Sequence, residues 1–174
     1  TDINALQRAP MVTYLSLSNN GLTTEGTAAI ANYPYLQYLS LAQNNIDSIA
    51  NLTGLKHLTE LRLHNNRLTD VRALRSLVNL EILYLGHNQI QDIGFFNTLT
   101  ALEVLYVNDN KISDISMLTA LSKLEIINVS NNNISSLSVL RNYTGTLTEI
   151  YAENNRLTDF SFINGASKLH ILML

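Results

Sequence analysis

The chain has 174 residues, of which 46% are hydrophobic and 14% are charged, with 11 lysines and arginines against 14 acidic residues. High apolar content with a net charge of only -3 favours burial, so the composition predicts one folded domain over residues 1–174 rather than a disordered chain. The lack of cysteine excludes disulfides and thiolate zinc sites, the acidic balance argues against nucleic-acid binding, and no apolar run approaches the roughly 18 residues needed for membrane insertion.

One frame of apolar residues and asparagine recurs along the chain, with the form L-x-x-L-x-L-x-x-N-x-L. Its copies begin near residues 12, 36, 58, 80, 102, 124 and 147, and a truncated eighth begins at 169. The starts are 24, 22, 22, 22, 22, 23 and 22 residues apart, which leaves no room for a linker or a second domain. A period of this length is typical of a solenoid built from stacked coils.

Each copy predicts a short strand followed by a return segment. Apolar residues two apart, such as Leu61 and Leu63, indicate a strand whose alternate side chains face inward. The asparagine three residues later ends the strand, and its amide can donate to and accept from the backbone of adjacent coils. Stacked coils would then form an asparagine ladder, which comprises Asn20, Asn44, Asn66, Asn88, Asn110, Asn132 and Asn155.

The return segments carry apolar residues three apart, which suits a short helix or 3-10 turn. The first return differs: Thr24 before a run that ends at Pro34 predicts a capped α-helix of two turns or more. An aspartate also recurs just after the Asn-x-Leu/Ile element of four copies, at Asp70, Asp92, Asp114 and Asp159. We interpret these carboxylates as caps of the return segments, because calcium needs several oxygens converging on one point.

This frame resembles the leucine-rich repeat family over almost the whole chain. Copies of the form N-x-I-x-D-I-x-x-L-x-x-L, as in residues 110–121, are similar to the repeats of bacterial internalins and of the phosphatase-regulator type. The resemblance implies an α/β solenoid, a right-handed horseshoe with a concave parallel β-sheet and short helical or 3-10 convex returns. Two departures stand out: Ala152 replaces a large core residue, and the proline that internalins often carry after Asp-Ile is missing.

The third and fifth positions of each frame are expected to face outward on the concave sheet, since inward and outward side chains alternate. These positions carry five tyrosines, an aromatic that tolerates solvent at one edge and is enriched at recognition surfaces. We expect an exposed patch at the centre of the sheet, although β-branched and aromatic residues also favour strands for their own packing. The predicted partner-binding residues are Tyr14, Tyr38, Arg62, Ile82, Tyr84, Val104, Tyr106, Ile126, Glu149 and Tyr151.

The sheet side is also expected to be weakly acidic. Positions two, three, five, seven, eight and ten of the copies together hold seven acids and four bases, which accounts for the net charge of -3. A mildly basic protein surface would be steered towards this side.

Nothing in the sequence predicts catalysis, a cofactor or a metal. It contains no G-x-S-x-G elbow, no phosphate-binding glycine loop and no H-E-x-x-H. His64 and His87 fall on neighbouring coils, but no third ligand accompanies them.

The sequence therefore predicts a non-enzymatic module that binds another protein. The resemblance to internalins implies a secreted or cell-surface bacterial adhesin. Two alternatives remain open: a cytoplasmic scaffold of the phosphatase-regulator type, and the recognition arm of a larger enzyme. Because the sequence stops at Leu174 inside the eighth frame, we expect the natural chain to continue or this end to be covered by another molecule.

Overall fold

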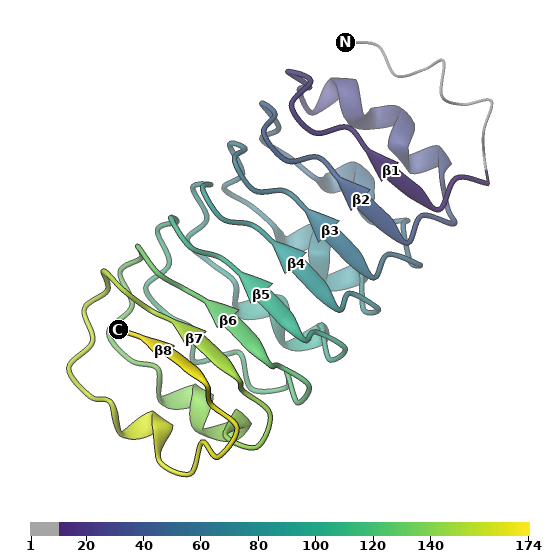
Figure 1. Ribbon diagram of the computed structural model, residues 1–174. Coiled ribbons are helices and arrows are strands. Elements are labelled where there is room, and N and C mark those ends of the chain that lie inside the picture. The colour runs from purple at the N-terminus through teal and green to yellow at the C-terminus, as the bar shows by residue number, and fades with distance from the viewer. Residues whose placement is uncertain (1–10) are drawn as a thin grey trace.

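A computed structural model describes residues 11–174 as a row of stacked coils, each contributing one strand to a single parallel sheet (Figure 1). The eight strands follow one another in sequence order across the sheet. They are β1 Tyr14–Ser16, β2 Tyr38–Ser40, β3 Glu60–Arg62, β4 Ile82–Tyr84, β5 Val104–Tyr106, β6 Ile126–Asn128, β7 Glu149–Tyr151 and β8 Ile171–Met173. Every strand occupies the third to fifth positions of its frame, so the predicted solenoid is confirmed.

Adjacent coils stack in register. Leu61 of β3 pairs with Leu83 of β4, which in turn pairs with Leu105 of β5. The backbone bonds continue beyond the strands, as where the Leu85 N–H donates to the Tyr106 carbonyl at 2.7 Å. Equivalent positions of the copies therefore form columns along the solenoid, spaced by about 4.8 Å, the distance between paired strands.

The returns lie behind the sheet and are mostly 3-10 helices (Figure 1). Their bounds are η2 Glu25–Asn32, η3 Ala50–Leu52, η4 Arg72–Ser76, η5 Gly94–Thr98, η6 Ser138–Tyr143 and η7 Ser161–Ile163. The prediction of short helical or 3-10 returns is confirmed for these coils, whereas the segment between β5 and β6 contains only turns.

The prediction of a capped α-helix in the first return was wrong. Residues Glu25–Asn32 form a 3-10 helix, and the Thr24 side chain makes no capping bond to it. The Thr24 hydroxyl instead bonds to the next coil, where it donates to the Asp47 carboxylate at 2.6 Å and accepts the Ser48 N–H at 3.0 Å. The Thr24 hydroxyl, which could have capped an isolated helix, therefore bonds to the adjacent coil instead.

The four recurring aspartates begin the returns, as predicted. Each carboxylate accepts the backbone N–H two residues later, at 2.9 Å for Asp70, 2.8 Å for Asp92, 2.7 Å for Asp114 and 2.8 Å for Asp159. The bond persists in the coil of Asp114, whose return has no helix, so it stabilises the turn itself. Hydrogen bonds from the Arg72 side chain and backbone lower the pKa of Asp70 to about 2.

The interior of the solenoid is a column of apolar side chains closed by the predicted asparagine ladder. Leu83, Leu105 and Phe96 have no exposed surface, and Ala152 is also buried at its place in the column. Asn110 shows the ladder bonding: its amide nitrogen donates to the Leu85, Val107 and Asn108 carbonyls, and its oxygen accepts the Ile90 N–H. The buried amide is therefore fully paired with backbone, which makes its burial tolerable.

The eighth position of each coil adopts the left-handed backbone conformation, which the sequence analysis did not identify. Seven coils place a non-glycine residue there, with φ between 53° and 58°: Asn19, Gln43, Asn65, His87, Asp109, Asn131 and Asn154. This residue turns the chain out of the strand just before the ladder asparagine. Asn and Asp are the non-glycine residues that tolerate such a φ best, which explains the frequent Asn-Asn pairs of the sequence.

Candidate functional site

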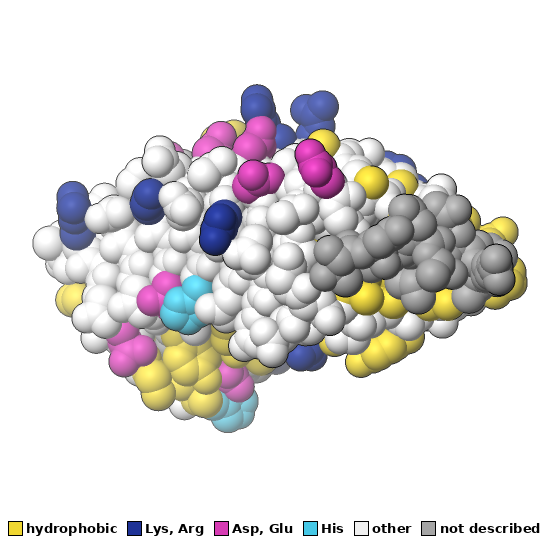
Figure 2. All heavy atoms as spheres, turned by 90° about the horizontal axis from the view of Figure 1, so that it is seen from above, with side chains coloured by type: hydrophobic (Ala, Val, Ile, Leu, Met, Phe, Trp, Pro, Cys, Tyr) yellow, Lys and Arg dark blue, Asp and Glu magenta, His cyan; other side chains and the backbone are white. Residues whose placement is uncertain are grey.

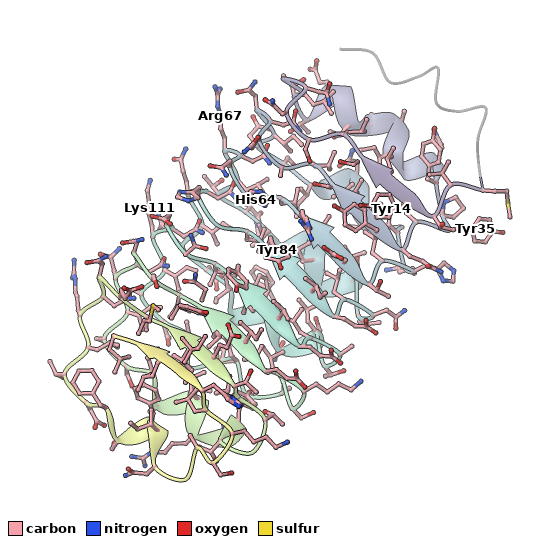
Figure 3. The ribbon with its side chains drawn as sticks, viewed as in Figure 1. Tyr14, Tyr35, His64, Arg67, Tyr84 and Lys111 are labelled. Atoms are coloured by element: carbon pink, nitrogen blue, oxygen red, sulfur yellow. The ribbon has the colours of Figure 1, made fainter. Side chains whose placement is uncertain are left out.

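The outward side chains of the strands form one continuous surface, which we call the sheet face. It consists of the third and fifth positions of the coils, and all ten predicted partner-binding residues lie on it. In Figure 3 the labelled Tyr14 and Tyr84 lie on this side of the molecule, and Figure 2 shows hydrophobic side chains gathered along the edge that the sheet face forms in that view.

The sheet face is less exposed than the sequence predicted. Ile82, Tyr84, Val104, Tyr106 and Ile126 are all half-buried rather than exposed, because neighbours in adjacent coils shield one another's flanks. The central side chains do face outward, as expected, but they are less exposed than the sequence predicted. Each side chain of the patch exposes only part of its surface, and its neighbours in adjacent coils restrict its movement.

Exposure also varies within the N-terminal strands. Tyr14 is 64% exposed, since it lies on the first strand that the structure describes. Ser40 was expected to face outward but is only 3% exposed, and its hydroxyl lies 2.6 Å from that of Ser18 in the preceding coil.

Five side chains on consecutive coils make an unbroken series of ring and cation contacts, which we call the aromatic stack. The rings of Tyr14 and Tyr38 lie parallel, with centroids 3.9 Å apart and 3° between their planes. The Arg62 guanidinium lies 5.6 Å from the Tyr38 centroid and 5.0 Å from that of Tyr84. Tyr84 and Tyr106 then follow at 5.0 Å with a tilt of 32°. The Tyr84–Tyr106 contact and both Arg62 contacts lie within the range in which ring–ring and cation–π attractions act, whereas the Tyr14 and Tyr38 rings stack at closer range.

The stack crosses from one column to another at Arg62. Tyr14 and Tyr38 occupy the third position of their coils, whereas Tyr84 and Tyr106 occupy the fifth. Arg62, also at the fifth position, reaches both rings and is fixed by the bond from its Nε to a Glu60 carboxylate oxygen at 2.6 Å. The sequence predicted that Tyr14, Tyr38, Tyr84 and Tyr106 face outward, but it did not predict that Arg62 bridges the two columns.

The C-terminal half of the sheet face is more polar. Asn128 interrupts the fifth-position column between Tyr106 and Tyr151, so Tyr151 is separate from the aromatic stack. The Tyr151 hydroxyl donates to a Glu149 carboxylate oxygen at 2.8 Å, and this bond raises the pKa of Tyr151 to about 12. The structure thus pairs these two predicted residues with each other and not with the stack.

The histidines at the edge of the sheet do not form a metal centre. The His64 ring meets that of Tyr84 edge-on at 6.2 Å, and burial, followed by the charge of Arg62, lowers the pKa of His64. His87 Nε2 lies 3.4 Å from an Asp109 carboxylate oxygen. Within residues 11–174, no three His, Asp or Glu side chains converge to hold an ion.

The fold and the sheet face define a solenoid that displays an aromatic surface, and comparison with known proteins identifies its family. The family description "Leucine Rich repeats (2 copies)" matches residues 56–99, 78–120 and 100–142, and "Leucine rich repeat" matches residues 10–68. The chain belongs to the leucine-rich repeat family, whose domains are typically protein-interaction modules. No curated protein matches the chain significantly by sequence.

Solved structures from bacteria and plants share the fold. Internalin C2 from Listeria monocytogenes is 28% identical over 97% of this chain and 84% of that one, with a TM-score of 0.80. A second internalin of that organism, inlF, is 25% identical over 95% of this chain and 61% of its own, with a TM-score of 0.67. The ectodomain of the Arabidopsis thaliana receptor kinase GASSHO1/SCHENGEN3 is 27% identical over 92% of this chain and 21% of its own, with a TM-score of 0.80.

The repeats of this chain are therefore internalin-like. The chain spans less than two thirds of the length of inlF and of the GASSHO1/SCHENGEN3 ectodomain. None of the helices within residues 11–174 has the length and apolarity needed to cross a bilayer.

Proposed function

We propose that this chain is a non-enzymatic recognition module that binds a protein partner on its sheet face. The aromatic stack is the observation that carries the proposal. Its Tyr and Arg side chains belong to the types that dominate binding energy at protein interfaces. Because neighbouring rings already hold these side chains in place, little conformational entropy is lost when a partner covers them.

The remaining predicted residues extend the same surface. Ile82, Val104 and Ile126 form an apolar column beside Tyr84 and Tyr106, and a partner that covers both columns would bury apolar area. Glu149 and Tyr151 provide a polar margin at the C-terminal side. An apolar centre with a polar margin is the usual arrangement of a protein interface.

We further propose that the whole chain forms one domain and acts outside the cell or at its surface. The described residues share one continuous core, with no boundary between coils. Two relatives are internalins, and the plant relative is an ectodomain whose structure was solved in complex with Casparian strip integrity factor 2. These relatives support an extracellular, protein-binding role for this chain.

The test is a quantitative pulldown with the immobilised chain, compared with Tyr84→Ala, Tyr106→Ala and the control Tyr35→Ala. Tyr35 is 49% exposed and lies before β2, outside the sheet face. Loss of a central anchor costs about 2 kcal/mol or more, so each sheet-face variant should bind its specific partner roughly thirtyfold more weakly. Equal capture by wild type and both sheet-face variants would place the interface elsewhere.

A further inference from the structure

A row of three carboxylates lines one side of the sheet face, just before the strands. Glu81, Glu103 and Glu125 occupy the second position of three consecutive coils. They are in register, because the Glu103 N–H donates to the Glu81 carbonyl and the Glu125 N–H to the Glu103 carbonyl, each at 2.8 Å. We call these three residues the acidic row. Their like charges repeat at about 4.8 Å, a spacing at which they repel one another.

Three cations line the opposite side, on the turns that follow the strands. Arg67, Lys111 and Arg156 occupy the tenth position of alternate coils and are all exposed. Their backbone N–H groups donate to the carbonyls of Ile46, Ile90 and Ile134 at 2.9, 2.8 and 2.8 Å, so this line also runs in register along the solenoid. Figure 3 shows Arg67 and Lys111 projecting from the turns, and Figure 2 shows that lysine and arginine side chains are spaced apart on the face seen from above. We call these three residues the basic rim.

Four of the five charged side chains between the two lines have a side-chain partner, and Glu153 is the exception among residues 11–174. Glu60 pairs with Arg62 at 2.6 Å, Glu149 accepts a bond from Tyr151, and Asp109 lies beside His87. By contrast, the acidic row makes no side-chain hydrogen bond or ion pair with any other residue in 11–174.

The basic rim is bonded only to neutral amides. Lys111 Nζ lies 3.5 Å from Gln89 Oε1, and the Arg156 guanidinium lies 3.1 Å from Asn133 Oδ1. Glu153 shares the turn of Arg156 and Asp109 shares the turn of Lys111, so the positive charge of the basic rim is offset least at Arg67. The side before the strands therefore carries a net negative charge, and the side after them carries a weaker net positive charge, three bases against the two acids Asp109 and Glu153.

The dimensions between the two lines fit a helix. The strip between the two lines spans positions two to seven, three of them in a strand, so at about 3.3 Å per residue it is at most roughly 16 Å wide. An α-helix is about 10–12 Å across and leaves room for a charged side chain on each flank. Its pitch of about 5.4 Å is close to the coil spacing of about 4.8 Å, so successive helical turns would meet successive coils. The apolar strip beneath it consists of Ile82, Tyr84, Val104, Tyr106 and Ile126.

We propose that the partner element received by the sheet face is an amphipathic α-helix that lies along the solenoid axis. Its apolar stripe covers the central strip, its basic flank faces the acidic row, and its acidic flank faces the basic rim. The inference rests on the proposed function and adds the chemical class of the bound element. A uniformly basic partner, as the overall charge of the sheet side suggested, would meet repulsion at the rim.

The test uses stapled helical peptides of about 14 residues, enough to cross five coils at about 1.5 Å per residue. One peptide carries Lys on one flank of a Leu/Ile stripe and Glu on the other. A second has the same composition but mixes Lys and Glu on both flanks, and a third carries two central prolines that prevent a helix. In fluorescence anisotropy at low salt, the segregated peptide should bind about tenfold more tightly than either of the others.

Glu103→Lys and Glu25→Lys form a matched pair of protein variants, because each changes the net charge equally. Glu103 is central in the acidic row, whereas Glu25 is exposed on η2 behind the sheet. Glu103→Lys should remove the advantage of the segregated peptide, and Glu25→Lys should keep it. Circular dichroism establishes that both variants are folded.

Equal binding of the segregated and mixed peptides, stronger binding of the proline peptide, or no binding of any peptide would overturn the inference. The outcome is separable from that of the proposed function. If Tyr84→Ala releases the cellular partner while Glu103→Lys retains it with unchanged affinity, the sheet face remains the interface and the helix assignment fails.

Discussion

Replacing Asn110 with alanine tests the asparagine ladder, because the side chain of this residue joins two adjacent coils. Its amide nitrogen donates to the Leu85, Val107 and Asn108 carbonyls at 3.0, 3.1 and 3.1 Å, and its oxygen accepts the Ile90 N–H at 2.9 Å. Counting four lost bonds would overstate the effect, since the three carbonyls have other donors. Leu85 also accepts from Asn88, Val107 from Asn132, and Asn108 from the His87 N–H.

The Ile90 N–H is the group that truly loses its partner. An unpaired buried donor costs about 1–3 kcal/mol, and each shared bond to a carbonyl adds a few tenths. We therefore expect Asn110→Ala to lower the free energy of unfolding by about 2–4 kcal/mol. Asn110→Asp should be more destabilising still, because it places a carboxylate against three carbonyl oxygens.

Urea denaturation followed by circular dichroism measures this loss, with Asn20→Ala as the matched control. Asn20 holds the same frame position in the first coil, but its side chain is exposed, so water can reach the groups that it contacts, such as the Ser18 carbonyl. The control should cost less than about 1 kcal/mol. If Asn110→Ala is no more destabilising than Asn20→Ala, the ladder is not the stabilising element that its geometry indicates.

Three further substitutions test other features of the coils. Tyr143→Phe removes a buried hydroxyl that accepts the Leu121 N–H and donates to the Leu118 carbonyl, so unfolding should become easier by about 2–4 kcal/mol in urea melts, and an unchanged midpoint would contradict this. The pKa of Asp70 is lowered from 3.8 to about 2, so its bond to Arg72 stabilises the fold above pH 4 and is lost as the pH falls towards 2. Asp70→Asn should therefore flatten the dependence of Tm on pH between pH 4 and pH 2. Parallel curves for wild type and variant would contradict this prediction. Gln43→Gly relieves a left-handed φ of 56° and should stabilise by about 0.5–1 kcal/mol, and a lower Tm would show that the glutamine side chain offsets the strain.

The repeat made most of the fold predictable from sequence. Leu61 and Leu63 indicated which side chains of their strand face inward, and the same spacing predicted one strand in each of the remaining copies. The asparagine ladder followed from one buried polar position per copy, since such a group needs backbone partners. The first return was mistaken because helix signals are local, whereas the Thr24 hydroxyl is used by the neighbouring coil.

The candidate surface was predictable as a set of positions but not as an arrangement. Alternation along the strands identifies which side chains face outward, yet it gives no information on how far neighbours shield them. The bridging position of Arg62 depends on side-chain conformations that span two coils, which no spacing rule supplies. The left-handed residues could have been found from the Asn, Asp, Gln or His that precedes each ladder asparagine.

The direction of the bonds between coils has a mechanical consequence. The hydrogen bonds that join β4 to β5 and its equivalents point along the length of the solenoid, so tension applied to the two ends pulls directly on one coil boundary at a time. Coils should then peel off singly at low force, each releasing about 75 Å of contour length for 22 residues at about 3.4 Å apiece. An adhesive contact spread over several coils would tie these boundaries together, and so the bound molecule would resist stretching better than the free one.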